Sequence, residues 1–315
     1  MQNGHMANAL HKILRFGYAR LWHRWPVMIV PLMRRFRHFN KYWPQPFTPR
    51  SFNEKTLWRM LFDRRAIYAQ VAGKFEARDF VRRRLGTDEN LIPLIALIRH
   101  PSEVQHLKLP GTFILKINDG SQLRRIWRKG AAVDRDEMER LVADWLTHQQ
   151  AKWQREWVYT QVTHAVIAEH FIGSDAGVPP DDLKFNCYDG RVHAIAHVRR
   201  GGPAPLVNHY DRDWNCLPIK ASTGPMADPA PRPAELDEAI RIAEAVSAGF
   251  DFLRVDLFVV AGRIWFGELT TLHSAGILLL DPPEWDFTFG KPWVLPKGVG
   301  PISALLGGQP DLRVD

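Results

Sequence analysis

Hydrophobic and polar positions along the chain form two kinds of segment, which predicts a fold that mixes helices with strands. In the first kind, apolar residues share one face of a helix, as Leu236, Ile240, Ala243 and Val246 do. Helices are expected over residues 53–62, 67–85, 134–149 and 234–248.

Polar and glycine residues mark the ends of these helices. Ser51 and Glu54 have the spacing of a capping box, so the first helix is expected to begin there. Asp134 is a candidate N-cap for the third helix. Gly86 and Gly249 stop the second and fourth helices.

The second kind of segment is a short apolar run bounded by turn residues, which is typical of a strand. Strands are expected over residues 91–98, 112–117, 165–172, 184–188, 192–197, 253–260 and 263–269. The turn pairs Asp189-Gly190 and Ala261-Gly262 predict two antiparallel hairpins. Residues 200–233, rich in Gly, Pro, Asn and Asp, are expected to form a long loop. Hairpins in place of regular βαβ units favour the α+β class.

Composition bounds the class of protein. The chain has 315 residues, of which 45% are hydrophobic and 24% charged, which suits two or three lobes. It has no apolar run long enough to span a membrane and no secretory signal. Its two cysteines do not form a metal-binding spacing, so a reducing cytoplasm is expected. The P-loop pattern is absent.

Positive charge is concentrated near the start of the chain. The net charge is +8 and the pI is about 9.6, and residues 1–40 hold seven lysines and arginines with no acidic residue. Aromatic and aliphatic residues alternate with them. Residues 7–40 could therefore form a basic amphipathic helix that touches an anionic membrane surface, or one that packs on the body of the protein. Nucleic acid is not expected as a partner.

Two carboxylates in apolar strands are the first candidates for chemistry. Asp256 and Glu268 are 12 positions apart, with a turn between them, so they are expected to face each other across a hairpin. Burying two such carboxylates is costly unless a cation joins them, and Mg²⁺ prefers carboxylate and phosphate oxygens. Arg254 has the same side-chain parity. The alternative is a buried salt bridge from Arg254 to either carboxylate.

Positive side chains in other strands are further candidates. Lys116 interrupts an apolar strand and is followed by a turn, residues 118–121, whose backbone N–H groups could bind phosphate. The alternative is a lysine that reaches solvent from a strand end. Lys184 and the pair Arg199-Arg200 add positive charge nearby if the strands pair, or belong to a solvated face.

A set of short motifs resembles one family. Residues 49–58 read PRSFNEKTLW and are similar to the opening of the TupA-like ATP-grasp proteins, which often carry the labels polysaccharide-biosynthesis or glycosyltransferase-like protein. Further similar segments follow in order at residues 63–65, 74–81, 91–94, 113–116, 155–157, 167–169, 182–185, 210–215, 254–257 and 266–270. The resemblance spans about residues 49–295.

The resemblance implies an ATP-grasp fold, in which two α+β lobes clamp a nucleotide, preceded here by the basic amphipathic helical extension. The expected units are residues 1–48 for the extension, 49–110 for the N-terminal lobe, 111–170 for the lid subdomain and hinge, and 171–315 for the C-terminal subdomain with the metal site.

The resemblance also implies roles for the nucleotide-binding residues. Lys74 and Lys116 would hold the phosphates of ATP, and Asn118, Gly120 and Ser121 would belong to the loop that covers them. The hinge against adenine and ribose would consist of Glu169, His170, Phe171 and Ile172.

The remaining implied roles concern the metal and the reaction. Asp256 and Glu268 would bind Mg²⁺. Asp182, Lys184 and Arg200 are similar to positions that serve the triphosphate and acyl phosphate in glutamate ligases of the RimK type. The catalytic residues implied are Arg254, Lys184 and Arg200.

Two features depart from the family pattern. Related sequences usually have Gly-Ser-Gly after the strand lysine. Here Gly120-Ser121 is followed by Gln-Leu-Arg-Arg at residues 122–125, so the loop is expected to be less flexible and more basic. Many ATP-grasp enzymes end the metal motif with Glu-x-Asn. Here Thr270 stands in place of the asparagine, which puts a third metal ligand in doubt.

The expected activity is an ATP- and Mg²⁺-dependent ligation of a carboxylate to an amine through an acyl phosphate. Small-molecule acids and amines or a polysaccharide acceptor would be its partners, at the inner face of the membrane. His209 or His273 could take the proton from the amine, or be structural. One rival is a metal-dependent glycosyltransferase, because residues 211–213 read Asp-Arg-Asp. The other is a non-catalytic protein that binds membranes or nucleic acid.

Overall fold

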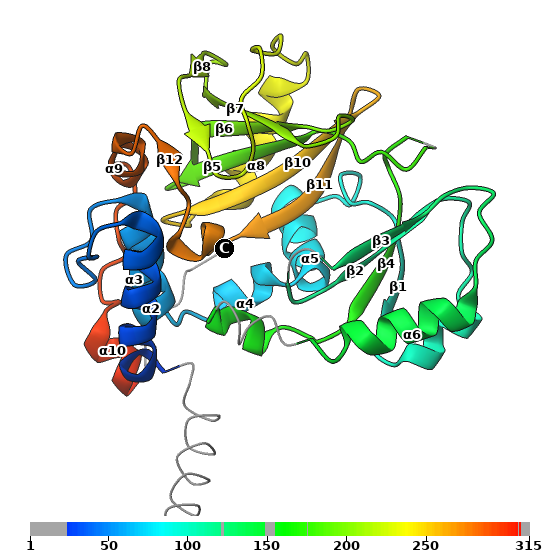
Figure 1. Ribbon diagram of the computed structural model, residues 1–315, viewed down its shortest axis with the longest axis horizontal. Coiled ribbons are helices and arrows are strands. Elements are labelled where there is room, and N and C mark those ends of the chain that lie inside the picture. The colour runs from blue at the N-terminus through cyan, green and yellow to red at the C-terminus, as the bar shows by residue number, and fades with distance from the viewer. Residues whose placement is uncertain (1–23, 121–122, 149–154, 175, 308, 310–315) are drawn as a thin grey trace, which may run out of the picture.

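Two antiparallel sheets form the centre of the computed structural model, which describes residues 24–120, 123–148, 155–174, 176–307 and 309 (Figure 1). The smaller sheet has four strands in the order β1-β4-β2-β3, and the larger has six in the order β11-β10-β5-β6-β7-β8. Helices surround both sheets. The α+β class that the sequence predicts is confirmed.

Seven of the strands lie close to the predicted segments, and the others were not predicted. Those of the four-stranded sheet are β1 (Leu94–Ile98), β2 (Phe113–Ile117), β3 (Arg124–Trp127) and β4 (Val166–His170). Those of the six-stranded sheet are β5 (Asp182–Tyr188), β6 (Arg191–Arg199), β7 (Leu206–Asp211), β8 (Cys216–Leu217), β10 (Leu253–Val260) and β11 (Arg263–Thr270). A separate two-stranded ladder pairs β9 (Lys220–Ala221) with β12 (Leu280–Asp281).

The six-stranded sheet has one apolar face and one polar face, because side chains alternate along each strand. Phe185 and Val255 are fully buried in the main core, where α8 (Leu236–Ser247) covers the sheet. The neighbouring positions on the same strands, Lys184 and Asp256, point to the opposite face. That face is therefore free for chemistry.

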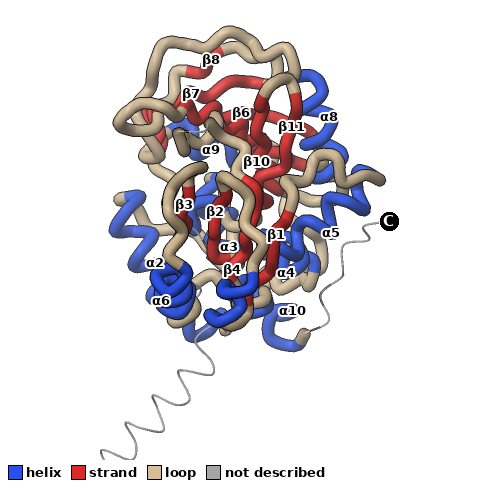
Figure 2. The backbone as a smooth tube through the Cα atoms, turned by 90° about the vertical axis from the view of Figure 1, so that its right-hand side faces the viewer, coloured by secondary structure: helices blue, strands red, loops and turns tan. Residues whose placement is uncertain are grey.

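The four-stranded sheet has a core of its own. Phe113 and Leu115 pack against Met138 and Val142 of α6 (Arg135–Trp145). Asp134 caps this helix as predicted, since its carboxylate accepts the backbone N–H groups of the first turn. Figure 2 shows this sheet in front, with α6 at its lower edge.

Further helices pack on one another and against β11 of the six-stranded sheet. The helix α3 (Phe52–Phe62) begins with the predicted capping box, in which Ser51 Oγ accepts from Glu54 N and the Glu54 carboxylate accepts from Ser51 N, both at 3.1 Å. Three more helices complete the fold: α4 (Ile67–Ala72), α5 (Lys74–Leu85) and α9 (Glu284–Gly290). A short helix, α10 (Pro301–Leu306), packs near α3.

Arg59 of α3 holds both ends of the β10–β11 hairpin. Its guanidinium is fully buried and donates to the carbonyl oxygens of Phe252 and Thr271, each at 2.9 Å, which flank the hairpin. It also forms an ion pair with Asp251 at 2.5 Å. The position of the hairpin therefore depends on α3.

The helix α2 (Trp25–Asn40) covers the described part of the basic segment. Met28, Leu32 and Phe36 on one of its faces are buried in the main core. In this part of the segment the apolar face packs on the body of the protein, which agrees with the second of the two alternatives for the basic segment. Residues 1–23 lie outside the described residues. No helix in the described ranges is long and apolar enough to cross a bilayer.

The predicted helix over residues 67–85 is divided at Gly73. Gly73 is extended, with φ −78° and ψ 137°, and a Cβ atom there would lie 2.5 Å from the Val162 side chain. The break places Lys74 at the start of α5, which ends at Gly86 as predicted.

Two other segments differ from the expected layout. Residues 200–233 are not a single loop, because β7 pairs with β6 along its whole length and buries Val207 and Tyr210. The boundary expected at residue 111 falls inside one sheet, since β1 pairs with β4.

Candidate nucleotide-binding site

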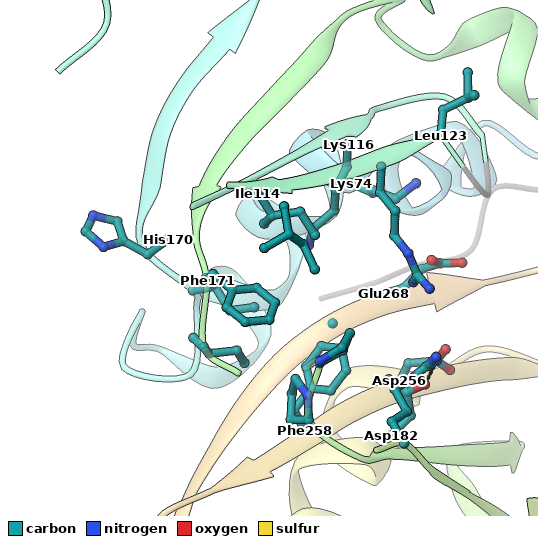
Figure 3. A pocket seen from close by; sticks show the side chains of 18 of the residues that line it. Lys74, Ile114, Lys116, Leu123, His170, Phe171, Asp182, Asp256, Phe258 and Glu268 are labelled. Atoms are coloured by element: carbon teal, nitrogen blue, oxygen red, sulfur yellow. Dashed lines mark hydrogen bonds and ion pairs between the residues drawn. The ribbon is translucent and has the colours of Figure 1, made fainter. Parts of the chain in front are cut away.

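A cavity between the two sheets gathers most of the residues that the sequence singles out (Figure 3). The predicted site residues that line it are Lys74, Lys116, Gly120, His170, Phe171, Ile172, Asp182, Lys184, Arg200, Asp256 and Glu268. Its other lining residues are Ile92, Ile114, Leu123, Arg124, Ile126, Pro179, Pro180, Phe258 and Gly267.

One end of the cavity is apolar. Ile114 and Ile126 contribute from the small sheet, and Phe258 from the large one. Phe171 lies in the segment after β4, where its backbone N–H donates to Thr112 O at 3.3 Å. Figure 3 shows Phe171 and Phe258 on opposite sides of this end. Apolar walls on two sides suit a flat aromatic base.

The other end is cationic and takes its charges from both sheets. Lys116 comes from β2, Lys184 from β5, and Arg200 directly follows β6, while Lys74 starts α5. Below, these four side chains are called the four cations. Their convergence suits a polyanion such as a triphosphate.

Lys116 and Lys74 are held in place by short contacts. Lys116 Nζ forms an ion pair with Glu169 Oε2 at 2.6 Å, and Arg78 binds the other oxygen of Glu169 at 3.0 Å. Lys74 Nζ donates to the carbonyl oxygen of Gly120. Burial lowers the pKa of the Lys74 ammonium, partly offset by nearby Glu268, so a bound anion would favour its charged form.

Asp256 and Glu268 are paired directly across β10 and β11, as the sequence predicts. The ladder shifts by one residue between Asp256 and Leu257, which leaves Gly267 as an extra residue in β11. A Cβ atom at Gly267 would lie 2.8 Å from the Phe258 ring and 3.1 Å from Asp256 O. This bulge brings the two carboxylates opposite each other.

Asp256 already has two cationic partners. Arg254 Nε lies 2.6 Å from Oδ1, and Lys184 Nζ lies 2.5 Å from Oδ2. Burial alone would raise the pKa of Asp256, but Arg254 and Lys184 outweigh it and lower the pKa to about 2. The salt-bridge alternative is therefore present in the structure.

Glu268 retains capacity for a metal. Its Oε1 accepts from Thr270 Oγ1 at 3.1 Å, and no described residue bonds to its Oε2. Within the described ranges, no cluster of three or more His, Cys, Asp or Glu side chains could hold a metal. Two carboxylates facing a polyanion site nevertheless fit Mg²⁺, which commonly takes its remaining ligands from phosphates and water.

Asp182 connects the two remaining cations. Its Oδ2 accepts from Arg200, and Lys184 Nζ lies 3.6 Å from the same oxygen. Because Asp182 and Lys184 are two residues apart on β5, they share the polar face of the sheet. The acidic residues between the cations limit their mutual repulsion before an anion binds.

Three predicted site residues that the structure describes do not line the cavity. Asn118 is fully buried, and its side chain bonds to Phe75 N at 2.7 Å and to Thr163 O at 2.8 Å, so it secures the start of α5 instead of facing the nucleotide. Glu169 and Arg254 lie behind Lys116 and Asp256 as ion-pair partners. Ser121 lies outside the described residues.

Sequence reasoning missed several apolar lining residues. Ile114 precedes Lys116 by two positions and Phe258 follows Asp256 by two, so strand parity alone could have placed both on the cavity face. Ile126 and Arg124 come from β3, which was not predicted at all.

The Asp211-Arg212-Asp213 triplet has a local structural role. The Asp211 carboxylate accepts the backbone N–H groups of Asp213 and Asn215 at 2.9 and 2.8 Å, which stabilises the turn after β7. None of the three residues lines the cavity. His209 and His273 also lie outside it.

Comparisons with known proteins give one family and several solved structures with low similarity to this chain. Similar solved structures include an ADP complex of N5-carboxyaminoimidazole ribonucleotide synthetase (12% identity, TM-score 0.40, 64% of this chain and 45% of that chain). The ATP-grasp ligase PsnB with a precursor variant, Mg and ADP is another (14%, 0.39, 68% and 53%). D-alanine–D-alanine ligase from Bacillus anthracis is a third (17%, 0.39, 66% and 60%). The chain thus spans 45–60% of the length of these three proteins.

A search of curated proteins gave no match. A family model described as TupA-like ATP-grasp matches residues 54–294, which is well over half of the chain and includes every element that lines the cavity. The chain therefore belongs to the TupA-like ATP-grasp family.

Proposed function

We propose that the protein is an ATP-dependent ligase that joins a carboxylate to an amine through an acyl phosphate. The observation that carries this proposal is the two-ended cavity, in which apolar walls lead to the four cations and to Asp256 and Glu268. An adenine ring suits the first end and a triphosphate the second.

In this proposal the two sheets hold different parts of ATP. Phe171 and Ile172 bind the base and ribose from the hinge, with Phe258 on the opposite side. Lys116 and Lys74 hold phosphates from the side of the small sheet, where Gly120 belongs to the covering loop. Partly buried cations attract phosphate more strongly than fully exposed ones, because water screens their charge less.

Asp256 and Glu268 would hold Mg²⁺, which screens phosphate charge when bound. Glu268 offers its unbonded Oε2, and Asp256 would share its oxygens with Lys184 and Arg254. Lys184, Arg254 and Arg200 would stabilise the charge that develops as the phosphoryl group moves.

The chemistry consists of two balanced steps. An oxygen of the substrate carboxylate attacks the γ-phosphorus of ATP, the bond to the bridging oxygen breaks, and ADP leaves. The amine nitrogen then attacks the acyl carbon of the acyl phosphate. The carbon–oxygen bond breaks, inorganic phosphate leaves, and the nitrogen loses a proton.

We also propose a surface polysaccharide or its precursor as one substrate, modified at the cytoplasmic face of a membrane. The support is the family resemblance together with the basic residues 1–40, which carry no acidic side chain. In this proposal basic residues near the start of the chain contact anionic lipid.

Melting curves with ATP, ADP or UDP-glucose, each with and without Mg²⁺, test the nucleotide class, because a ligand that binds the folded state raises the melting temperature. We expect stabilisation by ATP that Mg²⁺ enhances. Stabilisation by UDP-glucose alone would favour the glycosyltransferase and contradict the proposal.

Hydroxylamine tests the acyl phosphate directly, since this amine converts an acyl phosphate to a coloured hydroxamate. With ATP, Mg²⁺ and a panel of carboxylic acids, hydroxamate and ADP are expected in equal amounts. Asp256→Asn should abolish both, whereas Asp281→Asn, at an exposed position, should not. ADP release without hydroxamate for every acid would exclude this intermediate.

A further inference from the structure

A second cavity lies beside the first, and Lys184 lines both. It holds about 160 Å³. One water molecule needs only roughly 10–15 Å³ of such solvent-accessible volume, so the cavity has room for a small organic molecule. It lies on the polar face of the six-stranded sheet.

One row of paired residues across five strands contributes to both cavities. The row runs Glu268, Asp256, Lys184, Ala196 and His209, one residue from each of β11, β10, β5, β6 and β7. The first three residues line the first cavity, and the last three line the second. Ala196 has only a methyl group between two long side chains, and this leaves the hollow.

The opposite side of the cavity is formed by a strained segment, η3 (His273–Gly276), which is hydrogen-bonded to α2. Ser274 and Ala275 have φ angles of 49° and 48°, which non-glycine residues rarely adopt. Arg35 and Asn40 of α2 donate to carbonyl oxygens of this segment at 2.7 and 3.2 Å. Backbone strain of this kind persists where the surrounding structure enforces it, and it clusters at ligand sites.

Polar atoms around the cavity lack partners. Asn186 Oδ1, His209 Nδ1 and His273 Nδ1 are buried, and no described residue bonds to them. A buried polar atom without a partner costs stability, so such atoms point to a ligand or ordered water. Because all three belong to residues that line the cavity, its occupant should carry several hydrogen-bonding groups.

The charge of the lining selects the kind of occupant. Arg254 and Lys184 form the wall toward the first cavity, and no acidic residue among those described lines the second one. Burial lowers the pKa of His209 to about 4, so this imidazole is neutral and can donate and accept hydrogen bonds. A cationic group would find no carboxylate among the lining residues, whereas an anion would meet Lys184 and Arg254, the two cations that also bind Asp256.

We propose that the second cavity binds the carboxylate substrate, and that this substrate is a hydroxylated acid and not an amino acid. Its carboxylate lies against Lys184 and Arg254, and its hydroxyl groups bond to Asn186, His209 and His273. This inference rests on the proposed ligase function, because the acid must lie next to the γ-phosphate.

The position agrees with the first chemical step. An oxygen of a carboxylate held by Lys184 faces the first cavity, where the γ-phosphorus of ATP lies among the four cations. The new oxygen–phosphorus bond forms there as the bond to ADP breaks, and the acyl group stays in the second cavity.

Binding of four probes to the wild-type protein tests the chemical class. D-glucuronate has a carboxylate and hydroxyls, D-glucose lacks the carboxylate, pentanoate lacks the hydroxyls, and L-glutamate adds an ammonium group. We expect calorimetry in the presence of Mg²⁺ and ADP to show tightest binding for D-glucuronate. Tighter binding of L-glutamate, or equal binding of D-glucose, would overturn the proposal, as would no binding of any probe.

Filling the hollow tests the location. Ala196→Leu places a larger side chain between Lys184 and His209, and it should weaken D-glucuronate binding by at least about tenfold. The same change at the exposed Ala131, in the loop before α6, should have no effect. If Ala196→Leu does not fold, Ala196→Val fills less of the space and should show a smaller loss. Unchanged binding in a folded variant contradicts the proposal.

Measurements of ATP binding and of ADP release distinguish a failure of the acid site from a failure of the proposed ligase function. Ala196→Leu should retain stabilisation by ATP with Mg²⁺ and lose ADP release that depends on the acid. Wild-type protein that binds D-glucuronate but not ATP would refute the ligase function and leave the acid site. If the wild-type protein forms hydroxamate and Ala196→Leu is fully active, the ligase function stands and the second cavity is not the acid-binding site.

Discussion

Asp256 lies opposite Glu268 across the β10–β11 ladder because Gly267, the residue before Glu268 on β11, forms a bulge and has no partner on β10. Without that bulge the two-residue turn would pair Asp256 with Gly267, and Glu268 would point to the apolar face. The distance between the two carboxylates therefore depends on a residue that carries no side chain.

Gly267→Ala should weaken ATP binding by about tenfold, because a Cβ atom would displace the Phe258 ring in the first cavity. Calorimetry with ATP and Mg²⁺ measures the loss. Gly262→Ala is the matched control, since its Cβ has room but its φ of 75° costs about 1 kcal/mol of stability. Equal ATP affinities in both variants would contradict the role of the bulge.

Lys116→Met should lower ATP affinity by about tenfold or more, because a cation held at 2.6 Å by Glu169 is lost from the triphosphate end. Adenosine, which has no phosphate, should bind this variant as it binds the wild type. The exposed Lys108→Met serves as the control for charge. An equal loss for adenosine would indicate a misfolded site.

Arg59→Met should reduce the free energy of unfolding by at least about 3 kcal/mol, since it leaves Asp251 short of a partner and two carbonyl oxygens unsatisfied. Urea unfolding measures this loss. Arg83→Met, on the exposed side of α5, should change stability by less than about 0.5 kcal/mol. Similar values for the two variants would show that Arg59 does not secure the hairpin.

Acid should destabilise the fold through His209. Its pKa falls from 6.5 to about 4 on burial, so the unfolded chain binds the proton more tightly. The stability from the neutral imidazole is complete above pH 6.5 and is lost as pH falls toward 4, about 2 kcal/mol between pH 7 and 5. His209→Phe should lose this part of the pH dependence in urea unfolding, and an unchanged slope would refute the assignment.

Strand parity and turn signals suffice for the core of the site. Asp256 and Lys184 each interrupt an apolar strand, and their parity places them on the face away from Val255 and Phe185. The hairpins around Gly190 and Gly262 follow from local turn chemistry, so their strands could be predicted within a few residues.

Features that depend on distant contacts could not be predicted. Gly73, where the helix breaks, lies so close to Val162 that a side chain there would have no room, and β7 pairs with the edge of β6 after Pro205. The small side chain of Ala196 becomes informative only once Lys184 and His209 lie on either side of it. None of these relationships is local in sequence.

The hydrogen bond from Arg35 to the carbonyl oxygen of Ala275 joins residues 240 positions apart, and this separation has a consequence for folding during synthesis. At about 5–20 residues per second of synthesis, roughly 10–50 s separate the two ends of that contact. During this interval α2 can pack on α3, which follows it directly in the chain, but not on the later strands of the main core that also lies against Leu32 and Phe36. The nascent chain therefore exposes part of the apolar face of a basic helix to chaperones or lipid until the last strands of the core are complete.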